Sequence, residues 1–458
     1  MILVHIQNIV KTIRKKLNKL TPEVFLILLC IIQCIISISS HLLLDTPELD
    51  TVEMTIIGRD WIIGYPKHPM LPGWIMHFVL FTQNYMLAII IVLSFQMVIT
   101  YIYIFRLGTL LFNGNKNKAI TATIIASITP ISTYGAYMIN NVTIQLPLCA
   151  MMFFYSYKII QDTSIKNWVI LSIIAGLLIN THYLSVISIF AALLAIILLS
   201  RIKIISLFIF ATILIIMFSI HSYYLIHNDF MTFQYGYSRT HSDHNLILSS
   251  IEIFLLPLLV TFFYRNKITR SKEVSFVCLL YLIPLSTALI INFQVHFSSR
   301  WLVPFYIPLG FFIVMFVESA TKHCFKLFCI FTMMAFVSLS LLPLKNRTSF
   351  PSKLIYQTTF EHNKDIKYIS GPMFEAGAIA LRAANHPPVV FDGRFEMSPW
   401  INKSDFYQSK VLYIWENNEP KTPSSLESGV LEYAKISRYN QTKGGKFLYW
   451  KIVDYKLS

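Results

Sequence analysis

Long apolar runs recur along almost the whole chain and constrain its fold more than any other feature. A helix that crosses a bilayer needs about 20 consecutive apolar residues, and we expect about eleven such spans here. They are residues 24–43, 85–112, 119–134, 144–160, 168–180, 184–200, 204–225, 247–263, 276–293, 301–318 and 327–343. The 35 Phe and 24 Tyr exceed what a soluble core of 458 residues can cover. The sequence therefore predicts a mostly α-helical, polytopic membrane protein.

One apolar tract, residues 168–200, is too long for a single span. Its only polar interruption is Asn-Thr-His-Tyr-Leu-Ser at residues 180–185. A tract of this length needs either a strong tilt or a break. We expect two short helices that meet at a bend around this interruption.

The formal net charge of +15 lies mostly in short basic clusters between the apolar runs. Such a charge can indicate a nucleic-acid-binding protein, but Lys and Arg clustered in alternate loops orient a membrane protein. The basic residues that fit one cytoplasmic side are Lys11, Arg14, Lys15, Lys16, Lys19, Arg106, Lys116, Lys118, Lys166, Arg201, Lys203, Arg265, Lys267, Arg270, Lys272, Lys322 and Lys326. We therefore expect a cytoplasmic amino terminus, an uncleaved first span and a tail outside the cytoplasm.

The tail differs in composition from the rest of the chain. Residues 345–458 carry mixed charge, alternating segments such as PPVVFDG and GKFLYWKIV, and Gly and Pro turns. This pattern predicts a small α/β domain, so the expected division is a transmembrane catalytic part, residues 1–344, and an extracytoplasmic domain, residues 345–458. None of the six cysteines falls in the tail, and we expect no disulfides.

The first outer loop, residues about 44–84, concentrates charge in a chain that otherwise avoids it. Its charged and titratable residues include Asp50, Glu53, Arg59, Asp60, Lys67 and His68. A solvated connector is the simplest interpretation. The flanks WIIGY and MLPGWIMHFVLF are, however, amphipathic and carry tryptophan, which is typical of segments at a membrane interface. Such flanks would hold Asp50 and Glu53 at the membrane surface.

This loop, LDTVEMTIIGRDWIIGYPKHPMLPGW, resembles the first extracytoplasmic loop of glycosyltransferase family 39 proteins. That family includes the aminoarabinose-lipid A transferases and the protein O-mannosyltransferases, which have the GT-C membrane fold. A bacterial subgroup has Gly-Tyr-x-Lys-His-Pro-Pro-Leu-x-x-Trp in this loop, with Met70 here in place of the second proline. Further similar stretches are MINNVTIQLPLC at 138–149, NTHYLS at 180–185, HNDFMTFQYGYSR at 227–239, SSRWLVPFYIPLG at 298–310 and FDGRFEMSPW at 391–400.

The resemblance implies a polytopic enzyme of a bacterial inner membrane that uses a sugar carried on polyprenyl phosphate. The acceptor would be lipid A, another glycolipid or a protein. A hydroxyl acceptor needs a carboxylate base within hydrogen-bond reach, and the departing phosphate needs fixed positive charge. The first loop offers both.

The resemblance also implies roles for individual residues of the loop. The presumed catalytic aspartate of the family falls on Asp50. Glu53, one helical turn later, would share its face and fits three roles: a second acid, a metal ligand or a solvated neighbour. Lys67 and His68 stand where aminoarabinose transferases carry a Glu-Lys pair. Because Lys67 replaces the acid, a divalent cation stays an open alternative to the positive charge of Lys67 itself.

Further candidate substrate-binding residues come from several outer segments. They are Arg59, Tyr65, Lys67, His68, Asn140, His182, Tyr183, Arg300 and Trp301. Asn140 is equally an ordinary loop asparagine. A histidine at a helix bend within a membrane, such as His182, is costly unless it has a partner or a function. Arg300 suits a phosphate through paired donors, and interfacial anchoring is its alternative.

A transporter or flippase of lipid-linked sugars is the competing hypothesis from another class. Transporters tend to have repeated halves and ionisable residues near the middle of the membrane, whereas the acids here cluster in an outer loop. A non-catalytic assembly subunit is the third hypothesis. Five outer histidines, His221, His227, His241, His244 and His296, lack the compact spacing of a zinc site. The chain has no Gly-rich phosphate loop, which disfavours nucleotide-sugar chemistry.

Overall fold

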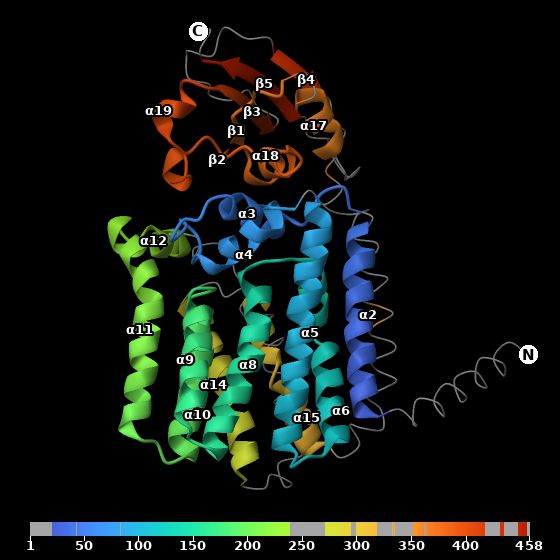
Figure 1. The fold of residues 1–458 in the computed structure, drawn as a ribbon, viewed down its shortest axis with the longest axis vertical. Coiled ribbons are helices and arrows are strands. Elements are labelled where there is room, and N and C mark those ends of the chain that lie inside the picture. The colour runs from blue at the N-terminus through green and yellow to red at the C-terminus, as the bar shows by residue number, and fades with distance from the viewer. Residues whose placement is uncertain are drawn as a thin grey trace, which may run out of the picture.

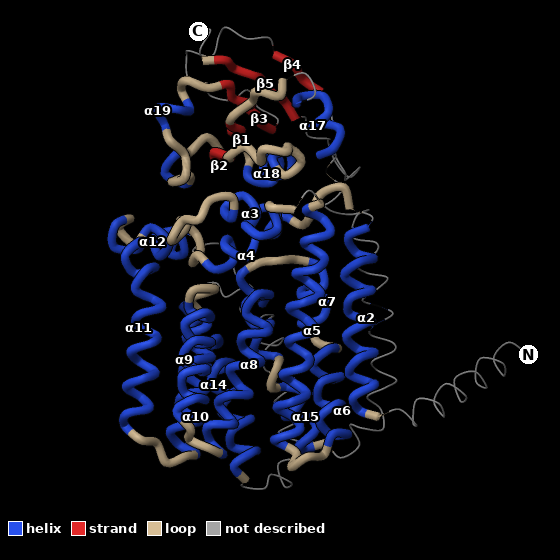
Figure 2. Tube along the Cα trace, in the orientation of Figure 1, coloured by secondary structure: helices blue, strands red, loops and turns tan. Residues whose placement is uncertain are grey.

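The computed structural model describes most of the chain. The described residues are 21–42, 44–82, 84–238, 271–294, 299–317, 332, 334, 350, 352–360, 363–416, 431–434 and 448–455. Figure 1 shows a bundle of roughly parallel and antiparallel helices, with shorter helices across one end and the tail beyond them. In Figure 2 all the described strands lie in the tail, beyond the short helices at one end of the bundle.

Five described helices are long and apolar enough to cross a membrane. They are α2 (Pro22–Leu42), α5 (Tyr85–Leu111), α8 (Asn141–Gln161), α11 (Ile204–His227) and α14 (Lys272–Gln294). Shorter apolar elements accompany them: α9 (Ile165–Ile179), α10 (Ser185–Leu199), and the 3-10 helix η2 (Ser299–Tyr306) followed by α15 (Leu309–Phe316). Predicted spans 247–263 and 327–343 lie outside the described residues apart from 332 and 334, so the number eleven stays a prediction.

The span predicted for residues 119–134 is a bent pair of helices. α6 (Lys116–Ser127) and α7 (Pro130–Tyr137) meet at an angle of 62°, and together they would count as a sixth span. The cause is local: Thr129 caps α7, and Pro130 cannot donate a backbone hydrogen bond to continue α6. We expected one span for this run and did not predict the break within it.

The bend predicted within residues 168–200 is present. α9 ends at Ile179 and α10 begins at Ser185. The Asn180 Nδ2 amide donates to the Gly176 carbonyl at 2.8 Å and to the Met217 carbonyl of α11 at 3.0 Å. The first bond satisfies a carbonyl oxygen in the last turn of α9, and the second fixes the bend against α11.

Two short helices of the first outer loop lie across the end of the bundle, α3 (Leu49–Gly58) and α4 (Leu71–Leu80) (Figure 1). The Glu48 carboxylate caps α3 by accepting from the Asp50 amide at 2.7 Å. A Cβ added to Gly58 would lie 2.5 Å from the Gly73 carbonyl. The glycine is therefore needed for the close approach of the two helices.

The tail forms a small mixed sheet with short helices. Its elements are α17 (Ser352–Phe360), β1 (Tyr368–Gly371), α18 (Met373–Ala380), β2 (Val389–Phe391), η5 (Phe395–Met397), α19 (Lys403–Phe406), β3 (Lys410–Glu416), β4 (Leu431–Ala434) and β5 (Leu448–Asp454). The strand order is β2-β1-β3-β5-β4. β1 runs parallel to β2 and β3, whereas β5 runs antiparallel to β3 and β4.

The tail packs directly on the first outer loop. Helix α18 lies so close to α3 that a Cβ on Gly377 would approach the side chains of Ile56 at 2.3 Å and Val52 at 2.7 Å. Near the start of the loop, the Arg382 guanidinium pairs with the Asp45 carboxylate at 2.6 Å. Helix α3 is thus held between the bundle and the tail, which fixes the side chains that it carries.

Candidate active site

Asp50, in the first turn of α3, is bound to the start of α8. The Asn140 Nδ2 amide donates to Asp50 Oδ2 at 3.0 Å. The oxygen of the same side-chain amide has a different role. Asn140 Oδ1 caps α8 by accepting from the Val142 and Thr143 backbone amides, each at 3.0 Å. Because the cap uses the oxygen, the nitrogen must face Asp50. The two predicted residues, 90 positions apart, therefore form one unit.

Substitution of Asn140 should separate its capping role from its contact with Asp50. Asn140→Asp keeps a good helix cap but replaces the donor to Asp50 with a second carboxylate. We expect stable protein whose turnover falls at least about tenfold, since a hydrogen bond to a charged group contributes about 1.5–3 kcal/mol. Activity and the thermal unfolding midpoint in detergent should be measured together. Full activity of Asn140→Asp would contradict this role.

Glu53, on the same helix, forms an ion pair with Lys67. The Lys67 ammonium donates to Glu53 Oε1 at 2.6 Å, and both side chains are largely covered, with 18% and 9% of their surfaces exposed. A carboxylate and an ammonium so far removed from water are stable only when paired. Among the described residues, Glu53 supplies the one oxygen that accepts from Lys67, and an ammonium has three donors. The pair can therefore still bind an anionic oxygen.

A hollow of about 200 Å³, counted with its open mouth, adjoins this ion pair. Its wall includes Glu53, Tyr65, Lys67 and His68 from the first loop, and Phe391 and Met397 from the tail. Tyr65 is buried, with its hydroxyl 3.4 Å from the Asp60 carbonyl and its ring edge-on to Trp400. Burial raises the pKa of the Tyr65 phenol far above its usual range, so the hydroxyl stays protonated.

The tail residues near Lys67 were not predicted as site residues. Phe391 and Met397 belong to the stretch FDGRFEMSPW, for which the sequence offered a resemblance but no chemical role. Met373, at the start of α18, places its sulfur 3.8 Å from the Lys67 nitrogen. The sequence feature that could have indicated this site is Phe391, the aromatic residue directly before an Asp-Gly turn. Asp392 and Gly393 both have positive φ, so the chain turns sharply at the end of the strand.

His68 lies near the predicted bend. It interacts electrostatically with His182, and the Leu71 amide donates to the Asn180 carbonyl at 3.0 Å. The rings of His182 and Trp301 lie 6.1 Å apart. In the part of the chain that the structure describes, His182 Nδ1 is buried and has no hydrogen-bond partner. A buried polar atom of this kind is costly unless it is used, so His182 stays a candidate ligand-binding residue.

The Tyr183 side chain contacts other residues than the His182 side chain does. Its hydroxyl lies 2.6 Å from His221 Nε2 in α11, and its ring stacks on Phe233 at 5.0 Å. Phe233 belongs to α12 (Met231–Ser238). These contacts join the bend to α11 and α12, and they give Tyr183 a packing role beside any contact with a ligand.

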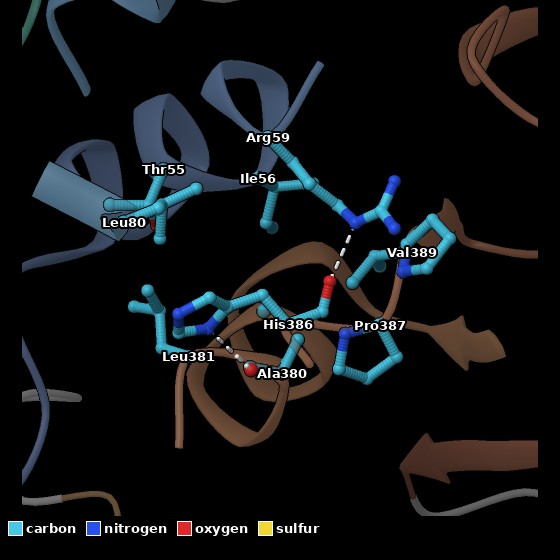
Figure 3. Close-up of a pocket in the computed structure, with 11 residues that line it drawn as sticks. Thr55, Ile56, Arg59, Leu80, Ala380, Leu381, His386, Pro387 and Val389 are labelled. Atoms are coloured by element: carbon cyan, nitrogen blue, oxygen red, sulfur yellow. Dashed lines mark hydrogen bonds between the residues drawn. The ribbon is translucent and has the colours of Figure 1, made fainter. Parts of the chain in front are cut away.

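Arg59 lies at the far end of α3 and is not grouped with Asp50 and Glu53. Its Nε donates to the His386 carbonyl at 2.6 Å, as Figure 3 shows, and its guanidinium pairs with Asp60 at 3.0 Å. These contacts border a second, mostly apolar hollow of about 250 Å³ between the loop and the tail. Burial, with the Arg59 charge adding to it, lowers the pKa of His386. Arg59 therefore connects the end of α3 to the tail through its hydrogen bond to His386.

The predicted phosphate-binding role of Arg300 is untested, because only its place in η2 is described and its side chain lies outside the described part. His241, His244 and His296 also lie outside the described residues. Within the described ranges, no group of three or more His, Cys, Asp and Glu side chains is placed to hold a metal ion. Because the Glu53 carboxylate already faces the Lys67 ammonium, these residues do not fit a divalent cation at that position.

Comparisons with known proteins support the resemblance found in the sequence. Residues 67–224 match the family model of the dolichyl-phosphate-mannose-protein mannosyltransferases. No curated protein gives a significant match. Among solved structures, the chain is similar to ArnT from Cupriavidus metallidurans in the apo state, with 10% identity and a TM-score of 0.60, over 90% of this chain and 96% of that one.

The same ArnT bound to undecaprenyl phosphate also matches, with 10% identity and a TM-score of 0.63, over 93% of this chain and 97% of the other. At this level of identity the likeness shows the fold. The matching family model and the shared fold together confirm the similarity of this chain to the glycosyltransferase family 39 proteins of the GT-C type.

Proposed function

We propose that the protein is a membrane glycosyltransferase that moves a sugar from a polyprenyl-phosphate carrier to an envelope acceptor outside the cytoplasm. The observation that carries the proposal is that α3 carries a fixed carboxylate, Asp50, and, one turn later, Glu53, which holds the largely covered Lys67 ammonium with donors left to offer. The family match and the fold of an ArnT that binds undecaprenyl phosphate support the same carrier.

In the proposed reaction an acceptor hydroxyl attacks the anomeric carbon of the donor sugar. Asp50 takes the hydroxyl proton as the new carbon–oxygen bond forms, and Asn140 holds the carboxylate in place. The bond between the anomeric carbon and the phosphate oxygen breaks at the same time. The phosphate leaves with the electron pair, and Lys67, with His68 beside it, stabilises the added negative charge.

The proposal includes the arrangement of the chain in the membrane. Residues 1–344 form the transmembrane catalytic part, and residues 345–458 form a periplasmic domain, with the amino terminus in the cytoplasm of a bacterial inner membrane. In support, the tail and the first-loop helices lie at the same end of the bundle, whereas α2 begins at the opposite end (Figure 1). The basic loops predicted as cytoplasmic agree with this orientation.

The donor class gives the direct test. Purified protein in lipid nanodiscs should transfer sugar from a set of undecaprenyl-phosphate-linked pentoses and hexoses, and not from the corresponding nucleotide sugars. The readout is mass spectrometry of envelope glycolipids and proteins supplied as acceptors. Efficient use of a nucleotide sugar would refute the proposal. Movement of a lipid-linked sugar across a sealed vesicle without transfer would favour the transporter alternative.

A further inference from the structure

Three separate parts of the chain converge on the Lys67 ammonium. The first loop supplies Lys67 and its partner Glu53. Helix α12 supplies Tyr235, whose ring centroid lies 5.5 Å from the nitrogen. The tail supplies Phe391, with its ring centroid at 5.7 Å, and the Met373 sulfur at 3.8 Å. Both rings lie within the about 6 Å at which a cation is attracted to an aromatic face.

Phe391 is held rigidly in this position. It ends β2, its amide donates to the Ser398 hydroxyl at 2.9 Å, and its ring lies edge-on to Trp400 at 5.1 Å. Only 4% of its surface is exposed. Trp400 is itself fixed, since its indole N–H donates to the Val389 carbonyl at 3.1 Å. The tail therefore presents a buried, hydrogen-bond-anchored aromatic residue to a cation from another part of the chain.

We infer that the tail completes the binding site for the donor phosphate, with Phe391 as the positioning residue that aims the Lys67 ammonium. This inference rests on the proposed role of Lys67 in binding the carrier phosphate. A lysine side chain has four rotatable carbon–carbon bonds, and holding it in one rotamer costs conformational entropy. Glu53 constrains the ammonium from one side. The Tyr235 and Phe391 rings and the Met373 sulfur, which is only a weak acceptor, constrain it from other sides. Donor capacity of the ammonium is therefore left for a phosphate oxygen.

A double-mutant cycle between Phe391 and Lys67 tests the inference, with undecaprenyl phosphate as the binding probe and the full chain in nanodiscs. Phe391→Leu keeps an apolar side chain but removes the aromatic face. We expect it to weaken binding about threefold to tenfold, the range of a partly desolvated cation–π contact. In the Lys67→Met background, Phe391→Leu should change the affinity less than about twofold, because no cation is left to position.

Two further variants serve as controls. Phe391→Tyr keeps the aromatic face and should bind the probe within about twofold of the wild type. Phe395→Leu is the matched control, because Phe395 lies in the same tail and has the Lys403 ammonium 5.3 Å from its ring centroid. It packs among tail residues, against Phe406 and Tyr407. We expect Phe395→Leu to leave undecaprenyl-phosphate binding unchanged.

The outcomes separate this inference from the proposed function. An equal loss from Phe391→Leu in both backgrounds would mean a general effect on the tail and would overturn the inference alone. Unaltered binding by Phe391→Leu in folded protein would do the same. Unaltered binding by Lys67→Met would remove the proposed phosphate contact itself, and the inference with it. If Phe391→Leu fails to fold, Phe391→Met replaces the ring with a flexible, unbranched side chain that adapts to an irregular space, and the same loss is expected.

Discussion

Asp50→Asn should lower the turnover of lipid-linked sugar by about 10² to 10⁴, the range typical for loss of general acid–base help. Asparagine keeps the size of the side chain and can still accept the hydrogen bond from Asn140, but it cannot take a proton from the acceptor. The protein should still fold, because Asp50 is only partly buried at the start of a capped helix. Turnover should be measured at saturating donor and acceptor, relative to the amount of purified protein.

Asp60→Asn is the matched control for this experiment. Asp60 is a carboxylate of the same loop, but it pairs with Arg59 beyond the end of α3 and is 37% exposed. A partly exposed ion pair contributes little to stability, so we expect activity within about twofold of the wild type. Well-folded Asp50→Asn protein with near-normal transfer would show that the acidic loop serves binding or topology and that Asp50 is not the base.

Lys67→Met should reduce kcat/KM for the donor by about 10² to 10³, the range seen when one charge-stabilising donor is removed from an active site. Both the affinity for the carrier phosphate and the stabilisation of the leaving phosphate are expected to fall. Asp50 is untouched by this change, so the base remains. Steady-state kinetics with varied donor would show a rise in KM together with a fall in kcat.

The single variant Lys67→Met leaves the Glu53 carboxylate without its ion-pair partner, although only 9% of the Glu53 side chain is exposed. A buried carboxylate without its partner destabilises the fold strongly. The double variant Lys67→Met with Glu53→Gln removes both charges and should regain stability without regaining activity. Activity restored by the double variant would mean that Lys67 only neutralises Glu53. Glu53→Gln alone tests the alternatives for Glu53: a minor loss fits a neighbour, and a loss like that of Asp50→Asn fits a second acid.

Local sequence patterns predicted much of the fold. The apolar runs located the described long helices, and the polar interruption at residues 180–185 located the bend between α9 and α10. These features depend on neighbouring residues, whose hydropathy the sequence displays directly. The break between α6 and α7 was missed, although Pro130 marks it. The segments on both sides of Pro130 are largely apolar, so the hydropathy of the run does not show that the proline interrupts the helix.

The sequence by itself identified the membrane class, the family resemblance and the first loop as the place where the charged groups lie. It also named both Asp50 and Asn140, and both Glu53 and Lys67, but it could not pair them. Only the tertiary structure decided that Asn140 turns its amide nitrogen to Asp50, that Arg59 points to the tail, and that Phe391 lies over Lys67. Such contacts join residues far apart in the chain, and they are set by how whole helices and the tail pack, which no periodicity within a single segment records.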